Sequence, residues 1–252
     1  MTTMFRLDGK IALVTGAGQN VGAGIARTLA ALGATVVVND YHLTRAETVC
    51  DEIRNAGGKA NVAAFDVTDL SAVVEAFTGV AKELGPVDIL VNNAGTGGPH
   101  GVMKMAQFRD MPTENWKGII DVNLFGVLNC CKAAIDSMVE RGWGRIITMS
   151  SGAGMRGLDI GVSPYAAAKA GSAGFMRHLA MENAAFGVTC NTIALGLVTD
   201  NPGPIQKLAD AIPVKRLGRP EDPAYLCAYL ASEESSWFTG QTLHLDGGST
   251  TT

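Results

Sequence analysis

The chain lacks the cysteine and histidine patterns that mark metal-binding and disulfide-rich proteins. Its 252 residues include five cysteines, which form no CxxC pair and, being odd in number, cannot all be joined in disulfides. We therefore expect reduced, mostly buried thiols in a cytoplasmic protein. The four histidines are scattered without an HExxH motif, so we expect no bound metal.

Long apolar runs and basic clusters are also scarce. No run approaches the ~18 apolar residues of a membrane span, and the N-terminus has no apolar core of signal-peptide length. The net charge is −4, and the most basic stretch, Lys215-Arg216 with Arg219 nearby, is too small for a nucleic-acid footprint. We expect a soluble protein that binds neither membrane nor nucleic acid.

Apolar residues make up 47% of the chain, which is enough for a large core. Several short runs are continuously apolar, as is typical of strands covered on both faces; they lie at 10–16, 34–40, 61–67, 87–95, 144–151, 188–196 and 240–248. Segments with helical periodicity lie at 21–32, 44–56, 70–84, 116–141, 163–186 and 220–232. This alternation, without a linker or repeat, predicts one α/β domain over residues 1–252, with a parallel sheet between two layers of helices.

A glycine-rich turn, TGAGQNVG at 15–22, joins the first strand to the first helix. In that position, backbone N–H groups and the positive end of the helix can hold a pyrophosphate. Gly16 would make the turn and Gly22 would let the helix approach the sheet. Asn20 stands where a further glycine is expected, and Asn tolerates a positive φ. The alternative is a plain strand-to-helix turn.

Asp40 ends the second strand, where a carboxylate can accept both ribose hydroxyls of NAD and repel the additional phosphate of NADP. Gln19 in the turn is uncharged, so no basic residue there awaits that phosphate. These two residues favour NAD over NADP. The alternative for Asp40 is a helix-capping or turn residue.

Tyr165 and Lys169 are four residues apart on a predicted helix and therefore share a face. A lysine ammonium beside a phenol lowers the pKa of the phenol below its usual value of about 10. Such a tyrosine can donate and accept a proton near neutral pH. Taken alone, however, a Tyr/Lys pair at this spacing is an ordinary helix-surface feature.

These motifs occur together with NNAG at 92–95, DVNLFGV at 121–127, SSG at 150–152 and a closing segment at 218–248 that ends in LHLDGG. In this order they resemble the short-chain dehydrogenase/reductase superfamily along essentially the whole chain. The resemblance implies a doubly wound, Rossmann-type, seven-stranded parallel sheet. It also implies NAD(P)-dependent interconversion of alcohols and carbonyls, and a homotetramer; the apolar residues on several faces of 116–141 and 163–186 fit that assembly.

The resemblance assigns a role to each catalytic candidate. Tyr165 would be the general acid/base, and Lys169 would lower its pKa and bind the nicotinamide ribose. Ser151 would donate a hydrogen bond to the substrate oxygen, and Asn123 would interrupt its helix and hold a water in a proton relay. Ser151 lies 14 positions before Tyr165, one more than is usual in the family, so Ser150 remains an alternative.

The resemblance also names the cofactor contacts: Gly16, Gln19, Asn20, Val21, Asp40, Tyr41, Asp66, Val67, Asn93, Ala94, Gly95, Tyr165, Lys169 and Val198. Asp66 and Val67 would contact adenine, with core packing as the alternative for Val67. Asn92 would brace the sheet instead. The chain departs from the family at Leu195, where a proline is usual, and at Asp200, where a threonine often binds the carboxamide. Thr199 or the backbone of Leu195 or Val198 could replace that contact.

Two further segments are candidates for contact with substrate. The loop 96–112, with Met103, Met105 and Phe108, would either roof an apolar cleft or form an oligomer edge, and His100 would either reach the substrate or be an exposed loop residue. The segment 198–216 is expected to form a lid, and its residues Ile205, Leu208 and Ile212 favour an apolar substrate.

The sequence therefore predicts an NAD-dependent oxidoreductase that interconverts a secondary alcohol and a ketone. One alternative is a reductase of 3-oxoacyl thioesters of acyl carrier protein or CoA that uses NADPH. A second alternative, from another class, is a dinucleotide-binding sensor without turnover, although such a protein has no need of a Tyr/Lys pair.

Overall fold

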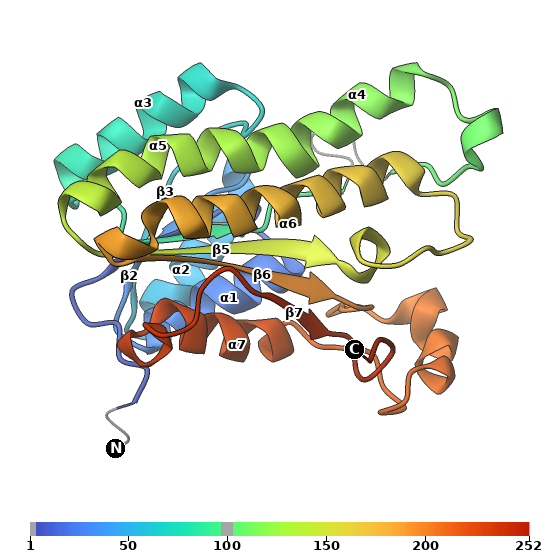
Figure 1. Cartoon of the computed structure of the whole chain (residues 1–252). Helices are drawn as coiled ribbons and strands as arrows, with labels where there is room; N and C mark the ends of the chain where they lie inside the picture. Colours follow the sequence, from blue (N-terminus) through green and yellow to red (C-terminus); the bar gives the residue numbers. More distant parts are fainter. Residues whose placement is uncertain (1–3, 97–102, 252) are drawn as a thin grey trace.

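A central sheet of seven parallel strands organises the molecule (Figure 1), and the computed structural model describes residues 4–96 and 103–251. The strands follow the spatial order β3-β2-β1-β4-β5-β6-β7. They are β1 (Ile11–Val14), β2 (Thr35–Val38), β3 (Lys59–Val62), β4 (Ile89–Asn92), β5 (Gly144–Ser151), β6 (Val188–Leu195) and β7 (Thr242–Leu245). The order reverses between β1 and β4, which confirms the doubly wound sheet and defines the switch point at which such sheets bind ligands.

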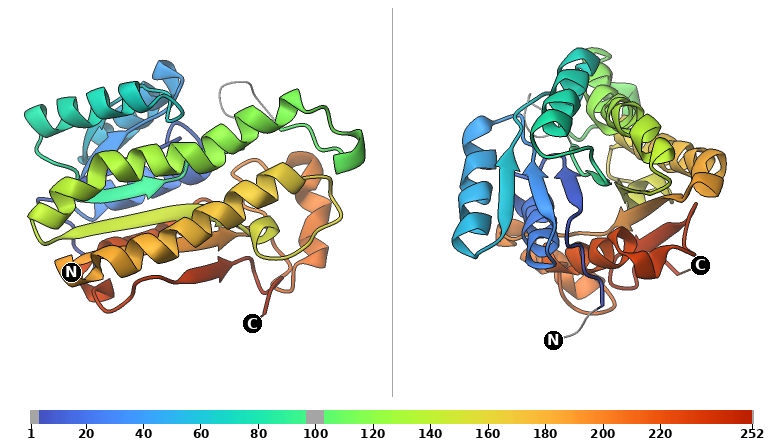
Figure 2. Two further views of the ribbon diagram at one scale, coloured as in Figure 1. Left: turned by 45° about the horizontal axis from the view of Figure 1, so that its top comes forward. Right: turned by 90° about the vertical axis from the view of Figure 1, so that its left-hand side faces the viewer.

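Helices cover both faces of the sheet because alternate residues of each strand point to opposite sides (Figure 2). Ala12 and Val14 of β1 pack in one core with α1 (Asn20–Ala31), α2 (Leu43–Asn55) and α7 (Glu221–Ala231). Ile11 and Leu13 pack in the other with α3 (Leu70–Glu83), α5 (Gly126–Glu140) and α6 (Ser163–Asn183). The continuous apolar runs at β1, β2, β4, β5 and β6 therefore do come from strands buried on both sides, whereas the edge strands β3 and β7 are only partly buried.

The prediction for the third strand was wrong in its position. The sequence favoured 61–67, whereas β3 ends at Val62. The side-chain amide of Asn39 donates to the backbone carbonyls of Ala63 and Phe65, 3.0 Å away in each case, and so replaces a strand partner. Phe65 and Val67 are buried beyond the strand against the helices, which explains their strand-like apolar pattern.

The long helix predicted at 116–141 runs from Glu114 to Glu140 as α4 (Glu114–Ile120), a π-helical turn (Asp121–Phe125) and α5. It is long and apolar enough to cross a membrane by length and composition, with a mean hydropathy of 1.4 in its most apolar window. In the fold it packs along α3 and α6 and over β4 and β5. The interruption at the π-helical turn confirms the local break expected around Asn123.

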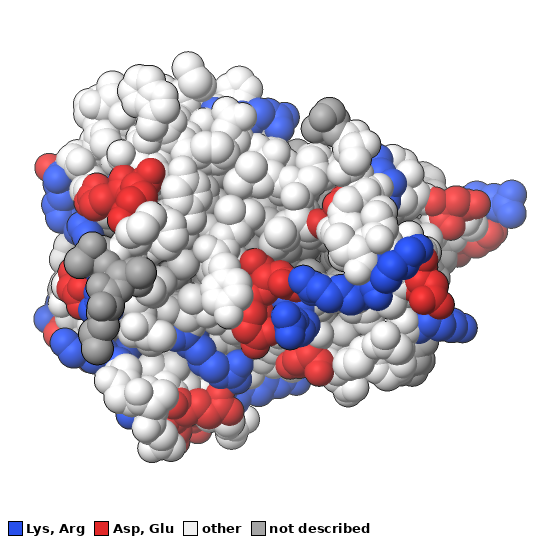
Figure 3. Space-filling view, turned by 90° about the horizontal axis from the view of Figure 1, so that it is seen from below, with Lys and Arg blue, Asp and Glu red and all other residues white. Residues whose placement is uncertain are grey.

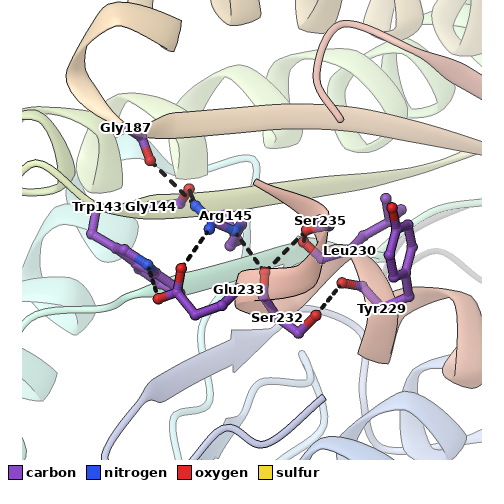
Figure 4. Close-up of polar contacts among 9 residues, drawn as sticks. All are labelled: Trp143, Gly144, Arg145, Gly187, Tyr229, Leu230, Ser232, Glu233 and Ser235. Carbon is purple, nitrogen blue, oxygen red and sulfur yellow. Dashed lines mark hydrogen bonds and ion pairs between the residues drawn. The ribbon is translucent and has the colours of Figure 1, made fainter. Parts of the chain in front are cut away.

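A polar network at the amino end of β5 ties the sheet to the end of α7 (Figure 4). Arg145 is only 2% exposed. Its guanidinium donates to the carbonyls of Gly144, Gly187 and Ser232 over 2.9 to 3.2 Å and forms an ion pair with Glu233 at 3.5 Å. Trp143 stacks against Arg145 and donates to Glu233 over 2.6 Å. The guanidinium adds a donor to the carbonyl of Gly187, which also accepts from the N–H of Gly144 over 3.4 Å, and to that of Ser232, which also accepts from the Ser235 hydroxyl over 3.1 Å.

The segment between β6 and α7 leaves the sheet and returns to it. Val198 pairs with Gly218 at its stem, and a 3-10 helix, η6 (Gly203–Ala211), forms its outer part. Ile205, Ala209, Ile212 and Leu217 make a small core of its own. The lid was predicted at 198–216; the structure extends its stem to Gly218, and we call residues 198–218 the lid below.

Candidate active site

A cavity of about 690 Å³ opens at the carboxyl ends of the strands, on both sides of the switch point between β1 and β4. Every residue predicted to contact the cofactor lines it, as do Ser150, Ser151, Tyr165 and Lys169. Sequence reasoning did not single out several further lining residues: Asn39, His42, Arg45, Phe65, Thr96, Val122, Met149, Gly196 and Leu197. They belong to no motif that the sequence analysis recognised, and only the topology brings them together.

The turn after β1 has the geometry of a phosphate cradle. Gly16 has a φ of +60° and Asn20 one of +47°, which confirms the left-handed conformation expected at Asn20. A Cβ at Gly22 would lie 2.3 Å from the carbonyl oxygen of Gly16, so only glycine allows α1 to begin this close to the sheet. The first turn of α1 has neither a side-chain cap nor an acidic residue. Its N–H groups are therefore left for an anionic ligand.

The Asn20 side chain leaves a further polar atom in the cavity, because its Oδ1 is buried and has no hydrogen-bond donor among the described residues. The pyrophosphate of a dinucleotide only accepts, but the ribose hydroxyls and amino groups of that molecule can donate to such an oxygen, so the residues present fit that group.

Asp40 lies at the far end of the cavity and is only 6% exposed. Its carboxylate accepts from the backbone N–H of Gly18 over 3.2 Å and from that of His42 over 2.9 Å. These bonds fix the carboxylate against the turn and leave lone pairs for ribose hydroxyls. Asp40 therefore does act as a turn-stabilising residue, and its place on the cavity wall also allows the ribose contact.

Arg45 was missed by the sequence analysis. Arg45 lies near the start of α2, several residues after the second strand. This part of α2 packs against the glycine turn, so that a Cβ on Gly18 would come within 2.5 Å of the Cβ of Arg45. Arg45 thus lines the cavity beside Asp40, and the described residues provide it with no ion-pair partner. The adenosine end of the site combines one carboxylate with one guanidinium.

The predicted adenine contacts and the motif NNAG both lie on the cavity wall. Asp66 accepts from the N–H and hydroxyl of Thr68 at one oxygen, over 2.9 Å, which leaves its second oxygen for a ligand. Asn93 donates to the carbonyls of Thr15 and Gly16 over 3.0 and 2.9 Å and so fastens the glycine turn to β4. Asn92 donates to Thr148 of β5 over 3.3 Å and braces the sheet as predicted.

Ser151, Tyr165 and Lys169 meet at the inner end of the cavity, where β5 ends beside the start of α6. The ammonium of Lys169 lies 5.8 Å from the centre of the Tyr165 ring and donates to the carbonyl of Met149 over 2.7 Å. The Ser150 hydroxyl donates to the backbone carbonyl of Lys169 over 3.0 Å. Ser150 is therefore engaged in holding α6 to β5, and the geometry favours Ser151 as the serine beside Tyr165.

Burial controls the protonation of both groups on α6. It raises the pKa of the Tyr165 phenol, an effect that the neighbouring Ser151 hydroxyl partly offsets. It lowers the pKa of Lys169 to about 8, because no carboxylate is paired with this ammonium among the described residues. The sequence predicted a phenol with a lowered pKa, and for the free chain that expectation was wrong, because burial raises the pKa of Tyr165.

Asn123 lies behind the cavity and is fully buried. Its amide donates to the carbonyls of Thr96 and Ile119 over 2.8 and 2.9 Å and accepts from the N–H of Thr96 over 3.1 Å. A Cβ on Gly95 would come within 2.8 Å of its Oδ1 and 3.3 Å of the Lys169 ammonium. The Asn123 side chain thus fixes the strand end that passes in front of Lys169, and its side-chain groups are already used in that contact.

The structure also shows where the residues lie at which the chain departs from the family pattern. Leu195 and Val198 line the cavity. The Thr199 hydroxyl instead accepts from the N–H of Asn201 over 3.1 Å, and Asp200 is exposed. The backbone of Leu195 or Val198 is therefore better placed for the carboxamide contact than the side chain of Thr199 or Asp200.

The two segments predicted to contact substrate differ in outcome. Of the described residues of loop 96–112, Thr96 lines the cavity, whereas Phe108 stacks on Trp116 with ring centres 5.2 Å apart. Met105 is exposed, and His100 lies outside the described residues. In the lid, Ile205 lines the cavity, Ile212 packs in the lid core and Leu208 is exposed. Ile205 therefore carries the apolar character expected of the lid.

Comparison with known proteins identifies the class. Residues 10–205 match the family model for short chain dehydrogenase. Oxidoreductase UcpA of Salmonella typhimurium is 38% identical over 261 residues, which cover 98% of this chain and 97% of that protein. The acetoacetyl-CoA reductase of Cupriavidus necator is 39% identical over 246 residues, which cover 95% of this chain and 97% of that protein.

A solved structure leads to the same class. The gluconate 5-dehydrogenase of Burkholderia cenocepacia, in complex with NADP and tartrate, has a TM-score of 0.88 at 32% identity, with 97% of this chain and 96% of that chain covered. The chain belongs to the short-chain dehydrogenase/reductase family. It is accordingly an oxidoreductase of a family that binds NAD(P).

Proposed function

We propose that the protein is an NAD-dependent oxidoreductase that interconverts a secondary alcohol and a ketone, with Tyr165 as its general acid/base. The observation that supports this most strongly is the convergence of Ser151, Tyr165 and Lys169 at the inner end of the dinucleotide-sized cavity. The cysteine, histidine, aspartate and glutamate side chains of the described residues form no cluster suited to a metal ion. A phenol and a serine hydroxyl are therefore the groups proposed to act on the substrate oxygen.

The bound dinucleotide supplies the acceptor or donor of hydride. In the reduction direction, the Tyr165 hydroxyl gives its proton to the carbonyl oxygen, and in oxidation the phenolate takes the alcohol proton. Ser151 donates a hydrogen bond to the same oxygen and stabilises the charge that develops there. Lys169 is buried 5.8 Å from the centre of the Tyr165 ring, and its ammonium favours the phenolate when the two groups approach.

Asp40 supports a preference for NAD over NADP, because its buried carboxylate would repel a phosphate on the adenosine ribose. Arg45 beside it attracts that phosphate, and the similar gluconate 5-dehydrogenase is a complex with NADP. We therefore expect a modest preference for NAD, with measurable use of NADP.

A second candidate function has a specific observation in its favour. The 39% identity to an acetoacetyl-CoA reductase extends over nearly the whole chain, so a 3-oxoacyl thioester is an alternative substrate, with NADPH as the reductant. A screen of secondary alcohols, ketones and acetoacetyl-CoA, followed at the nicotinamide absorbance with both dinucleotides, decides between the two. Turnover of acetoacetyl-CoA far above that of every simple ketone would favour the alternative. Dinucleotide binding without turnover would favour a sensor.

We further propose a cytoplasmic homotetramer that binds neither nucleic acid nor membrane. All five cysteines are buried and free, which suits a reducing compartment. A groove of about 700 Å³ between α5 and α6 is lined by Leu128, Ile135 and Phe175 among others and offers an apolar surface to a second subunit. The face in Figure 3 carries acidic and basic side chains interspersed. Light scattering tests the assembly, and a monomer would contradict it.

A further inference from the structure

The last residues of the chain lie between two segments that border the cavity and do not follow one another in sequence, and we call these two segments the walls. One wall is the lid, whose residues Val198 and Ile205 line the cavity. The other is the segment 152–162, which leads from the cavity-lining Ser151 into α6 but contributes no lining residue itself. Figure 1 shows the C-terminal segment beside the orange lid at the carboxyl end of the sheet. The C-terminal segment 246–250 touches both walls through specific contacts.

The contact with the lid depends on two glycines. Gly247 has a φ of +64°, and a Cβ there would come within 2.7 Å of Ile212 and Val214 side-chain carbons. Its carbonyl accepts from the N–H of Val214 over 3.2 Å. Gly248, with a φ of +88°, packs against Pro213. The end of the lid core is thus seated directly on the C-terminal backbone.

The contact with the other wall is a single charged hydrogen bond. Arg156, four residues after Gly152, donates through its guanidinium to the backbone carbonyl of Ser249 over 2.9 Å. That carbonyl is held in place by a local turn: the Ser249 hydroxyl donates to the carbonyl of Asp246 over 2.9 Å, and the Gly248 N–H donates to the Asp246 carboxylate over 3.1 Å. A hydrogen bond from a charged guanidinium to a carbonyl is stronger than a hydrogen bond between two neutral groups, and its geometry is more specific.

The same segment is anchored behind the cavity. The Gly196 N–H donates to the carbonyl of Leu245 over 3.0 Å, and a Cβ on Gly196 would come within 2.8 Å of the Asp246 backbone. Gly196 itself lines the cavity. The C-terminal segment therefore starts from a fixed point of the sheet and reaches both walls.

We propose that residues 246–250 form a brace that couples the lid to the segment after the catalytic serine, and that Arg156 is a positioning residue for substrate binding. The inference rests on the proposed function, since it concerns the substrate end of that site. Through the brace, the position of Ile205 on the lid depends on the position of Ser151 and Tyr165. The width of the substrate end is then set by a segment of which no residue lines the cavity.

Hydrogen exchange on the full chain with saturating NADH tests the brace without a known substrate. Arg156→Ala should speed exchange of the Val214 amide and of the other lid amides by about tenfold, although Arg156 does not contact the lid. Gly247→Ala, at the opposite end of the brace, should in turn speed exchange in 152–162. Arg156→Lys, whose ammonium can reach the same carbonyl, should restore most of the protection.

Arg177→Ala is the matched control, because Arg177 is another exposed arginine, placed on α6 more than three helical turns beyond Tyr165. It should leave lid exchange unchanged. If Arg156→Ala affects only 152–162 while the lid exchanges as before, the two walls are independent and the proposal is wrong. A failure of the dehydrogenase assignment would be seen differently, as absence of turnover or of NADH binding in the unaltered protein.

Discussion

A positively charged side chain is buried at each end of the parallel sheet, and the two differ in the number of their hydrogen-bond partners. At the amino end, Arg145 is 2% exposed and donates to three backbone carbonyls and a carboxylate. At the carboxyl end, Lys169 is 4% exposed and donates to the single carbonyl of Met149. Burial lowers the pKa of both side chains, but Glu233 opposes the shift at Arg145 alone.

This difference distinguishes a buried cation that stabilises the fold from one that is proposed to take part in the reaction. A buried charge whose donors are all occupied holds the surrounding backbone in one arrangement. A buried charge with few partners is destabilising, and it is retained where a ligand or a transition state completes its environment. Arg145 ties β5, β6 and α7 together far from the cavity, whereas Lys169 is held beside the phenol that is proposed to transfer a proton.

The largest effect is expected at the carboxyl end from Tyr165→Phe, which removes one oxygen and little volume. Turnover of any substrate found by the screen should fall by about 10²- to 10⁴-fold, the usual contribution of a general acid/base. NADH affinity, measured by calorimetry, should stay within a few-fold because the ring still packs on the cavity wall. Retained activity would remove Tyr165 from its role.

The amino end should respond in stability instead. Arg145→Met removes the guanidinium bonds to the carbonyls of Gly144, Gly187 and Ser232. It should lower the free energy of unfolding by about 3 kcal/mol, measured with urea. The matched change on its partner, Glu233→Gln, should lower it by less than about 1 kcal/mol, because that side chain is 66% exposed. Equal effects of the two changes would show that the ion pair, and not the carbonyl bonds, makes the contribution.

Lys169→Met should instead raise the free energy of unfolding, by an amount that depends on pH. In the folded chain Lys169 releases its proton near pH 8, whereas an unfolded lysine holds it to about 10.4. Between these values the unfolded state binds more protons, so the stability of the natural chain rises with pH in this window. Below pH 8 the full penalty of burying the charge is present, and the variant, which lacks it, should be more stable by about 1–3 kcal/mol.

This difference in stability should shrink as the pH rises from 8 to about 10, because Lys169 is then neutral in the folded natural chain and no longer costs the burial of a charge. Other groups titrate equally in both proteins and cancel in the difference. Urea unfolding at several pH values measures it, and the variant should at the same time be inactive. A constant difference across this range would mean that Lys169 stays charged in the folded chain throughout it, as it does in the unfolded chain.

The sequence could predict those parts of the comparison that depend on local pattern. The strand runs, the glycine turn and the Tyr165/Lys169 spacing each follow from short-range rules, and the structure confirms the topology and the place of these residues. The pKa of Tyr165, the position of β3 and the role of Arg45 depend on contacts between distant segments. Arg145 gave no sequence signal either, because a single arginine in a strand is ordinary until the end of α7 is seen to lie against it.

The smallest effects are expected at the adenosine end, where Asp40 and Arg45 carry opposite charges side by side. Asp40→Ala removes the repulsion of a ribose phosphate and should shift the ratio of NADPH to NADH affinity toward NADPH by about tenfold, or ~1.4 kcal/mol. Arg45→Ala should shift it the other way by a few-fold, because Arg45 is exposed and its charge is screened by solvent. Calorimetry with both dinucleotides measures the two ratios. If the unaltered chain already binds NADPH more tightly than NADH, the guanidinium dominates this end of the site and the argument from Asp40 is wrong.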